Sequence, residues 1–213
     1  MEITILDRLL LLLTGLTAVY IAYRFYNDYD KQRGPKPKQN IYYIISFIVL
    51  FVSGVLIIFA GFDILENPLI SIVATILPFG IAAGLIRQFY KKYETYYLIL
   101  MIVGLVAISL QQFKVIDMKM IYPLFHSIAG LTIFFVPIMA VKNKKTNKGF
   151  IWVTVGGAII GIGGIALAFL GAGNPLLGIF TAKVVFTILT PILLLMALAF
   201  TFGFMKDMKN PVG

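Results

Sequence analysis

The sequence predicts an all-α integral membrane protein, a single domain over 1–213 built as a bundle of seven transmembrane helices. Of its 213 residues, 60% are hydrophobic and only 13% are charged, and the mean hydropathy is +0.96. Soluble domains are about half apolar and about a quarter charged. The apolar residues also gather into long runs, and a helix needs about 20 such residues to cross a bilayer. Composition and run length together therefore place the chain in a membrane.

Each predicted helix corresponds to one apolar run. The third, fifth and seventh runs contain Pro78, Pro137 and Pro191. Proline is tolerated in membrane helices because neighbouring groups satisfy the carbonyl that it frees, and we expect a kink at each position. In chain order, the predicted helices cover 4–26, 41–62, 68–89, 95–113, 120–141, 150–172 and 175–204.

The sixth run is rich in glycine and predicts a close helix contact. Gly157 and Gly161 have GxxxG spacing, and Gly164 with Ala168 continues the pattern of small residues. Small residues let helix backbones approach each other closely. The contact lies either inside one bundle or between subunits.

The basic residues predict the orientation of the helices. Lysine and arginine concentrate in alternate loops, at 31–38, 87–92 and 142–148, and in the tail at 206–209. Cytoplasmic loops carry the excess of these residues, so we expect the N-terminus outside and the C-terminus in the cytoplasm, in the membrane of a prokaryotic cell. The net charge of +9 then reflects topology and contact with anionic lipid, and no nucleic-acid partner is expected.

Two short motifs recur along the chain. "GLT" stands at 15–17 and 130–132, and "NPL" stands at 67–69 and 174–176. A triplet of helices repeated in parallel around the fourth helix, a 3+1+3 repeat, would explain both pairs. Chance matches between common membrane residues explain them equally well. In helix plan alone, the arrangement resembles that of microbial rhodopsins and of SWEET- and PQ-loop-type carriers.

A lysine inside the seventh run raises the question of a bound ligand. Lys183 lies in "TAKVVF", which resembles the sequence around the retinal-binding lysine of microbial rhodopsins. That resemblance implies a chromophore on Lys183. However, Ile179 stands where the family has an acidic residue, and its third-helix arginine and carboxylates have no counterpart. We favour a lysine whose stem reaches back toward the outer interface.

Several polar residues fall in the outer third of the predicted helices. If the helices bring them together, they line an outward-facing polar vestibule; otherwise each separately faces the headgroups. The set consists of Asp7, Arg8, Gln111, Gln112, His126 and Lys183.

The residue types that are absent or rare exclude several kinds of chemistry. The chain has no cysteine, which excludes disulfides, thiolate catalysis and iron–sulfur clusters. A single histidine and no acidic cluster leave no expected metal site, no cofactor apart from bound lipid, and no enzyme activity.

We therefore expect a non-catalytic transmembrane subunit of a larger assembly, with other subunits or with copies of itself. A carrier of a small solute or ion is the alternative. A seven-helix receptor or sensor with a ligand at Lys183 is a further one.

Overall fold

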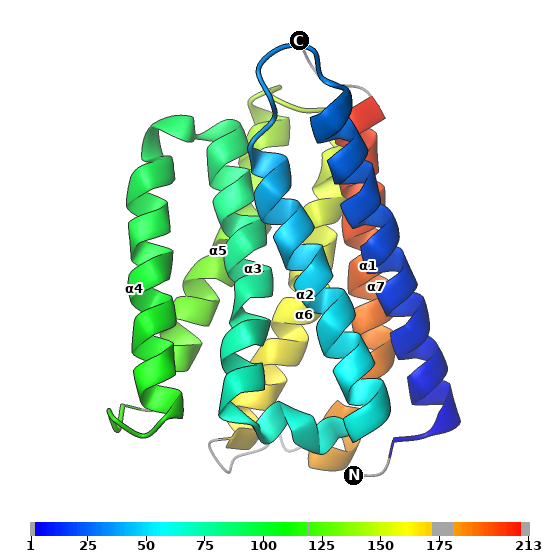
Figure 1. The fold of residues 1–213 in the computed structure, drawn as a ribbon, viewed down its shortest axis with the longest axis vertical. Coiled ribbons are helices and arrows are strands. Elements are labelled where there is room, and N and C mark those ends of the chain that lie inside the picture. Colours follow the sequence, from blue (N-terminus) through cyan, green and yellow to red (C-terminus); the bar gives the residue numbers. More distant parts are fainter. Residues whose placement is uncertain (1–2, 119, 172–180, 210–213) are drawn as a thin grey trace.

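The computed structural model describes residues 3–118, 120–171 and 181–209, and these residues form helices and short loops without any strand (Figure 1). Of residues 165–171, 182–183 and 209, only the backbone is described. The α-helices are α1 (Ile5–Lys31), α2 (Gln39–Ala60), α3 (Pro68–Phe89), α4 (Glu94–Gln112), α5 (Ile121–Lys142), α6 (Ile151–Gly171) and α7 (Ala182–Lys209). Short 3-10 turns, η1 (Phe62–Glu66), η2 (Lys91–Tyr93) and η3 (Lys148–Phe150), precede α3, α4 and α6.

The expectation of an all-helical membrane protein is confirmed. Among the described residues, six helices, α1 to α5 and α7, are long and apolar enough to cross a bilayer. The apolar stretch described around α6, Lys148–Gly164, is shorter. A count of seven membrane spans therefore stays a prediction.

The predicted helices that correspond to α1 and α7 end too early at their C-terminal sides. α1 continues to Lys31 instead of 26, and α7 continues to Lys209 instead of 204. An apolar run measures the thickness of the hydrocarbon, whereas a helix can continue into the headgroups and beyond. Asp28 and Asp207 are consequently helical residues. Part of the predicted start of the seventh helix, 175–180, lies outside the described residues.

Six of the helices form a closed ring. Each contacts the next in the order α1, α2, α3, α5, α6 and α7, and α7 contacts α1 again. α4 lies outside this ring against α3 and α5, at the left edge of Figure 1. We call the end with the α1–α2, α3–α4 and α5–α6 loops the basic end. The other end, with the start of α1, is the N-terminal end (Figure 1).

Local sequence signals explain where two of the helices begin. Thr4 caps α1, since its hydroxyl accepts from the Asp7 amide at 3.1 Å and the Asp7 carboxylate accepts from the Thr4 amide at 3.0 Å. Asn67 caps α3 by accepting from the Leu69 amide at 2.9 Å, and Pro68 occupies the first turn. Both arrangements satisfy backbone N–H groups that a helix start leaves free. The first "NPL" motif is thus a helix-start signal.

An aromatic cluster fills the ring where α1, α2 and α7 meet. Ring centroids lie 4.8 Å apart for Phe25 and Tyr43, and 4.6 Å apart for Tyr43 and Phe204. Phe47 and Phe200 complete the cluster. A separate, smaller apolar cluster near the N-terminal end joins Leu11, Ile57, Phe62 and Leu189.

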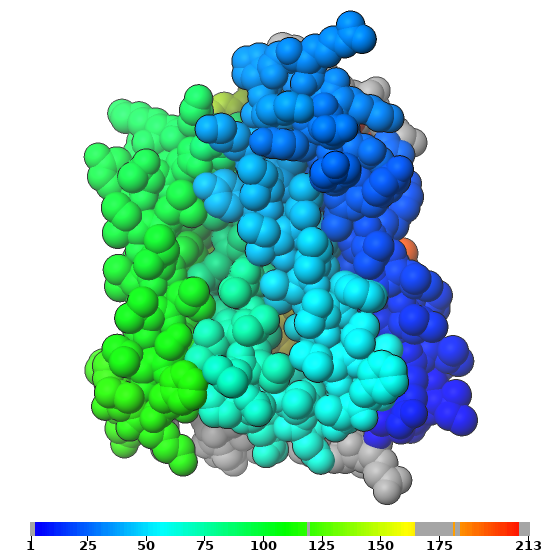
Figure 2. Space-filling model, in the orientation of Figure 1, coloured from blue at the N-terminus to red at the C-terminus, as the bar shows by residue number. Residues whose placement is uncertain are grey.

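The outer surface of the helices is apolar. Large side chains such as Leu13 on α1, Ile48 on α2 and Ile102 on α4 are exposed, and Figure 2 shows the face that these helices form. In a membrane this surface contacts lipid.

Glycines allow two close helix contacts. A Cβ on Gly203 of α7 would lie 2.8 Å from the backbone nitrogen of Val153 in α6, and one on Gly80 of α3 would lie 3.1 Å from the Tyr42 carbonyl oxygen. Of the predicted small-residue set, Gly157 lies against Ile133 of α5. Apart from the neighbouring backbone of α6 itself, no atom of the described residues would lie within 4 Å of a Cβ on Gly161 or Gly164. The Ala168 side chain lies outside the described residues.

Candidate functional site

The candidate site is a polar network at the basic end, built on neighbouring residues of α2 and α3. Successive side chains of a helix diverge by about 100°. Tyr42 and Arg87 therefore reach α4, whereas the next residues along each helix, Tyr43 and Gln88, reach α7. The network has two branches that leave the α2–α3 pair in different directions.

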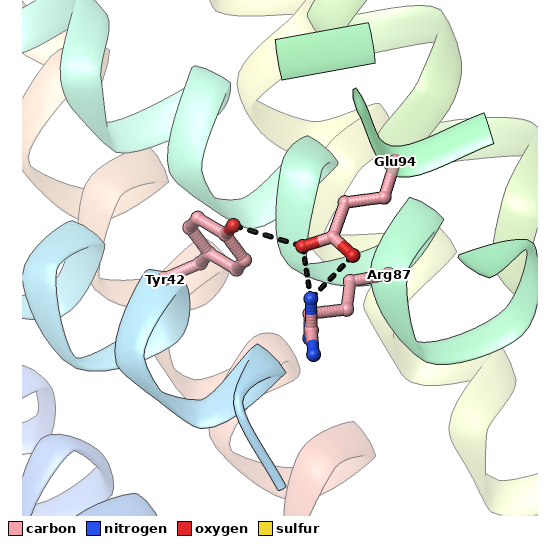
Figure 3. A network of polar contacts seen from close by, with 3 residues as sticks. All are labelled: Tyr42, Arg87 and Glu94. Atoms are coloured by element: carbon pink, nitrogen blue, oxygen red, sulfur yellow. Dashed lines mark hydrogen bonds and ion pairs between the residues drawn. The ribbon is translucent and has the colours of Figure 1, made fainter. Parts of the chain in front are cut away.

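The first branch fastens α4 to the ring (Figure 3). The Arg87 guanidinium donates to both carboxylate oxygens of Glu94, and the Tyr42 hydroxyl donates to Glu94 Oε1 at 3.0 Å. The Arg87 and Glu94 side chains are 18% and 13% exposed. Glu94 is also the first residue of α4, where a negative charge is favoured by the helix dipole. The charges of this branch balance, which is typical of a structural ion pair.

The second branch, the Asp207 network, crosses the ring to α7. The Tyr43 hydroxyl donates to Gln88 Oε1 at 2.8 Å, and Gln88 Nε2 donates to Asp207 Oδ2 at 2.6 Å. The Thr146 hydroxyl, from the α5–α6 loop, donates to Asp207 Oδ1. Two donors thus bond the carboxylate, one at each oxygen, and the Tyr43 hydroxyl bonds the Gln88 amide that supplies one of them.

The groups that bond Asp207 are neutral, and a like charge lies nearby. Asp28 of α1 interacts electrostatically with Asp207. Its own carboxylate accepts from Asn40 Nδ2 at 2.8 Å, and the same amide donates to the Phe25 carbonyl at 3.1 Å. Asp207 is half-buried, and its hydrogen-bond partners among the described residues carry no charge. Acidic residues within apolar helices of membrane proteins are rare and often functional.

A second carboxylate, which is buried, joins α7 to α1 at the N-terminal end. The Thr190 hydroxyl donates to Asp7 Oδ1 at 2.7 Å. Asp7 is 8% exposed and Thr190 is fully buried. Thr190 directly precedes Pro191, around which α7 continues as a helix. α7 is therefore bonded to the rest of the ring through a carboxylate at both of its ends, buried at Asp7 and half-buried at Asp207.

The residues predicted to form an outer vestibule fall into separate groups. Gln111 of α4 accepts from the Tyr122 amide at 2.9 Å, and His126 of α5 stacks on the Tyr122 ring with centroids 5.4 Å apart. Asp7 instead contacts α7, and α4 and α5 do not pack against α1 within the described part of the chain. Arg8 is exposed and Gln112 is half-buried. The Lys183 side chain lies outside the described residues.

Sequence reasoning missed the Asp207 network. Its acid stands in "KDMK", among lysines that were read as a cytoplasmic tail. The one signal in the sequence was that Asp207 is an acidic residue between lysines. Lysines in such a segment set the membrane topology, whereas an acidic residue contributes little to it, so Asp207 must be explained in another way. Its partners Gln88 and Thr146 lie far away in the sequence.

Comparison of the chain with protein-family models, with curated proteins and with solved structures finds no match. Chemically, the Asp207 carboxylate can accept a proton, and one of its two donors must then reorient.

Proposed function

We propose that this protein is a carrier, which moves a small solute across the membrane as α7 separates in turn from its neighbours at one end and at the other. The observation that carries the proposal is a pair of carboxylate contacts on α7, one with the buried Asp7 and one with the half-buried Asp207. Asp7 bonds Thr190 at the N-terminal end, and Gln88 bonds Asp207 at the basic end. A carrier needs a closure at each end of its pathway, and each closure must be reversible.

The chemistry of these contacts supports reversible closure. Each joins a carboxylate to neutral hydroxyl or amide donors, and such bonds contribute only about 0.5–3 kcal/mol each in proteins. Protonation of Asp207 would oblige it to donate through one oxygen, and either Gln88 or Thr146 would have to turn. The aromatic cluster of Phe25, Tyr43 and Phe204 lies directly beside this branch and fills the ring there.

The proposal includes a complete topology. All seven helices cross the membrane of a prokaryotic cell, with the N-terminus outside and the basic end in the cytoplasm. A parallel 3+1+3 repeat is supported by the order of contacts in the ring. The pairs α1–α2, α2–α3 and α3–α5 correspond to α5–α6, α6–α7 and α7–α1, with α4 outside.

A non-catalytic subunit of a larger assembly is the second candidate. It is favoured by Gly161 and Gly164 of α6, beside which the described residues leave space. Against it, Gly157 lies against Ile133 of the same chain, so part of the predicted interface is used internally. The receptor alternative depends on Lys183 and stays a prediction.

Labelling of introduced cysteines tests the carrier, because the natural chain has none. Leu189→Cys reports on the N-terminal end of α7, and Thr201→Cys, a nearly isosteric change, reports on its basic half. In sealed vesicles, a membrane-impermeant maleimide should label Leu189→Cys from the outside and Thr201→Cys from the inside.

Adding Asp207→Asn should accelerate labelling of Thr201→Cys by roughly fivefold, as expected for loss of about 1 kcal/mol of closure. Asp30→Asn, an exposed acid at the same end, is the matched control and should change neither rate. A rigid subunit predicts slow labelling at both positions, unaffected by Asp207→Asn, and that result would refute the carrier.

A further inference from the structure

Two lysine-rich segments are held side by side at the basic end, between α3 and α5. Lys145 Nζ donates to the Phe89 carbonyl at 2.9 Å and lies 4.4 Å from the centroid of the Tyr90 ring. Phe89 also packs against Phe150, with ring centroids 5.3 Å apart. These contacts connect the end of α3 to the α5–α6 loop.

The connection gathers more positive charge than the neighbouring acids carry, although Glu94 interacts electrostatically with Lys91. Lys91 and Lys92 follow Tyr90, whereas Lys142 and Lys144 precede Lys145, and all of these lysines are exposed. The adjacent acid, Glu94, is already bonded by Arg87 and Tyr42. Asp207, the acid that contacts the α5–α6 loop, accepts from Thr146 and Gln88. The lysines are therefore available to an anion.

The position of the lysines matches the depth of lipid headgroups. α3 ends at Phe89 and α5 ends at Lys142, so the lysines lie at or just beyond the ends of two spanning helices. Tyr90 and Tyr93 lie at the same level, and tyrosine is enriched where the hydrocarbon meets the headgroups.

An apolar stripe leads away from the same lysines. Leu131, Phe135 and Met139 of α5 recur at helical spacing, and all are exposed. The stripe ends one turn before Lys142 and runs along the surface that contacts lipid tails. A ligand that matches both parts carries an anionic head and an apolar tail.

We propose that Lys91, Lys92, Lys142 and Lys144 form a binding site for the headgroup of an anionic phospholipid, whose acyl chain lies along Leu131, Phe135 and Met139. Lys145 holds the two halves of the site together. The site is independent of the proposed transport activity and requires only that α3 and α5 span the membrane with the basic end at a leaflet surface. The apolar stripe favours a lipid over free phosphate, which has nothing to place there.

Native mass spectrometry of the full chain in detergent tests the site with phosphatidylglycerol as the probe and phosphatidylcholine as the neutral comparison. The wild-type protein should retain phosphatidylglycerol at least tenfold more strongly. The exposed double variants Lys91→Gln/Lys92→Gln and Lys142→Gln/Lys144→Gln should each lower that retention by roughly thirtyfold, since each lysine near an anionic surface contributes about 1 kcal/mol.

The matched control is Lys31→Gln/Lys38→Gln, which removes the same charge from exposed positions around the α1–α2 loop. It should bind like the wild type, and unchanged melting temperatures would confirm that all variants fold. Equal losses in the control and the site variants would overturn the proposal, because binding would then follow net charge alone. Displacement of the lipid by millimolar inorganic phosphate, but not by matched chloride, would also overturn it in favour of a free-anion site.

Discussion

At the scale of single residues, Asp207 accepts two hydrogen bonds from neutral groups, and it is the acceptor that these two donors use. Asp207→Ala would leave the Gln88 amide and the Thr146 hydroxyl without their acceptor. An unpaired buried donor costs about 1–3 kcal/mol, so we expect the free energy of unfolding to fall by that amount. Thermal unfolding in detergent measures it, with the exposed Asp30→Ala as control. A similar loss in both variants would show that the network adds no stability.

Tyr42 and Tyr43 offer a matched comparison, because they are adjacent residues whose hydroxyl groups donate to different acceptors. Tyr43→Phe keeps the ring contacts with Phe25 and Phe204 but leaves Gln88 Oε1 without its donor. Tyr42→Phe removes one donor from Glu94, which keeps both bonds from Arg87.

We therefore expect Tyr43→Phe to destabilise the protein by about 1 kcal/mol and Tyr42→Phe by less than half of that. Denaturation midpoints of the two variants in one detergent make the comparison. If Tyr42→Phe lowered the stability more than Tyr43→Phe, the branch to α4 would contribute more to stability than the Asp207 network.

At the scale of elements, the sequence predicted helices well and their contacts poorly. The range 68–89 for α3 is confirmed, because Asn67 and Pro68 mark its start and a basic segment follows its end. The helical turns that carry Asp28 and Asp207 were missed, since hydropathy registers the membrane and not the helix beyond it.

The site was less accessible to prediction than the helices. Asp7 was recognised as a polar residue of interest, but its partner Thr190 is 183 positions away. No periodicity within one helix indicates which distant helix it faces. Gln88 was unremarkable because its role depends on two partners, from α2 and α7.

Glycine spacing in the sequence also fails to show which helices are in contact, and the observed contacts yield a prediction. The GxxxG pair of α6 includes Gly161, beside which the described residues leave open space, whereas the tight α6–α7 contact uses Gly203 of α7. Gly203→Ala would place a methyl group 2.8 Å from the Val153 backbone nitrogen and should cost about 1–3 kcal/mol of stability.

Gly161→Ala serves as the control for that change. It should be neutral or stabilise the helix by up to about 1 kcal/mol, because alanine is the better helix former. Melting temperatures of the purified variants distinguish the two positions. The reverse order would place the critical contact at the GxxxG pair, as a subunit interface would require.

At the scale of the whole molecule, six helices contact one another in a closed ring and α4 packs outside it. α4 is held by the ion pair of Arg87 and Glu94, whose charges balance. α7 contacts α1 and α6 and is bonded through carboxylates to α1 and α3. If the ring opens, we expect it to open along α7, because the hydrogen bonds that hold α7 to α1 and α3 are few and can each break and re-form.

Distances between spin labels at the basic end test that motion directly. In a chain without natural cysteine, Lys38→Cys with Lys206→Cys spans from α2 to α7, and Lys38→Cys with Lys91→Cys spans from α2 to the end of α3. Pulsed electron paramagnetic resonance should give two distances for the α7 pair and one for the reference pair. Asp207→Asn should enrich the longer α7 distance, since it removes the charge that Gln88 and Thr146 hold in place. One narrow distance for both pairs, unchanged by Asp207→Asn, would mean that the carboxylates of Asp7 and Asp207 fasten a rigid scaffold, and the subunit would then be the better interpretation.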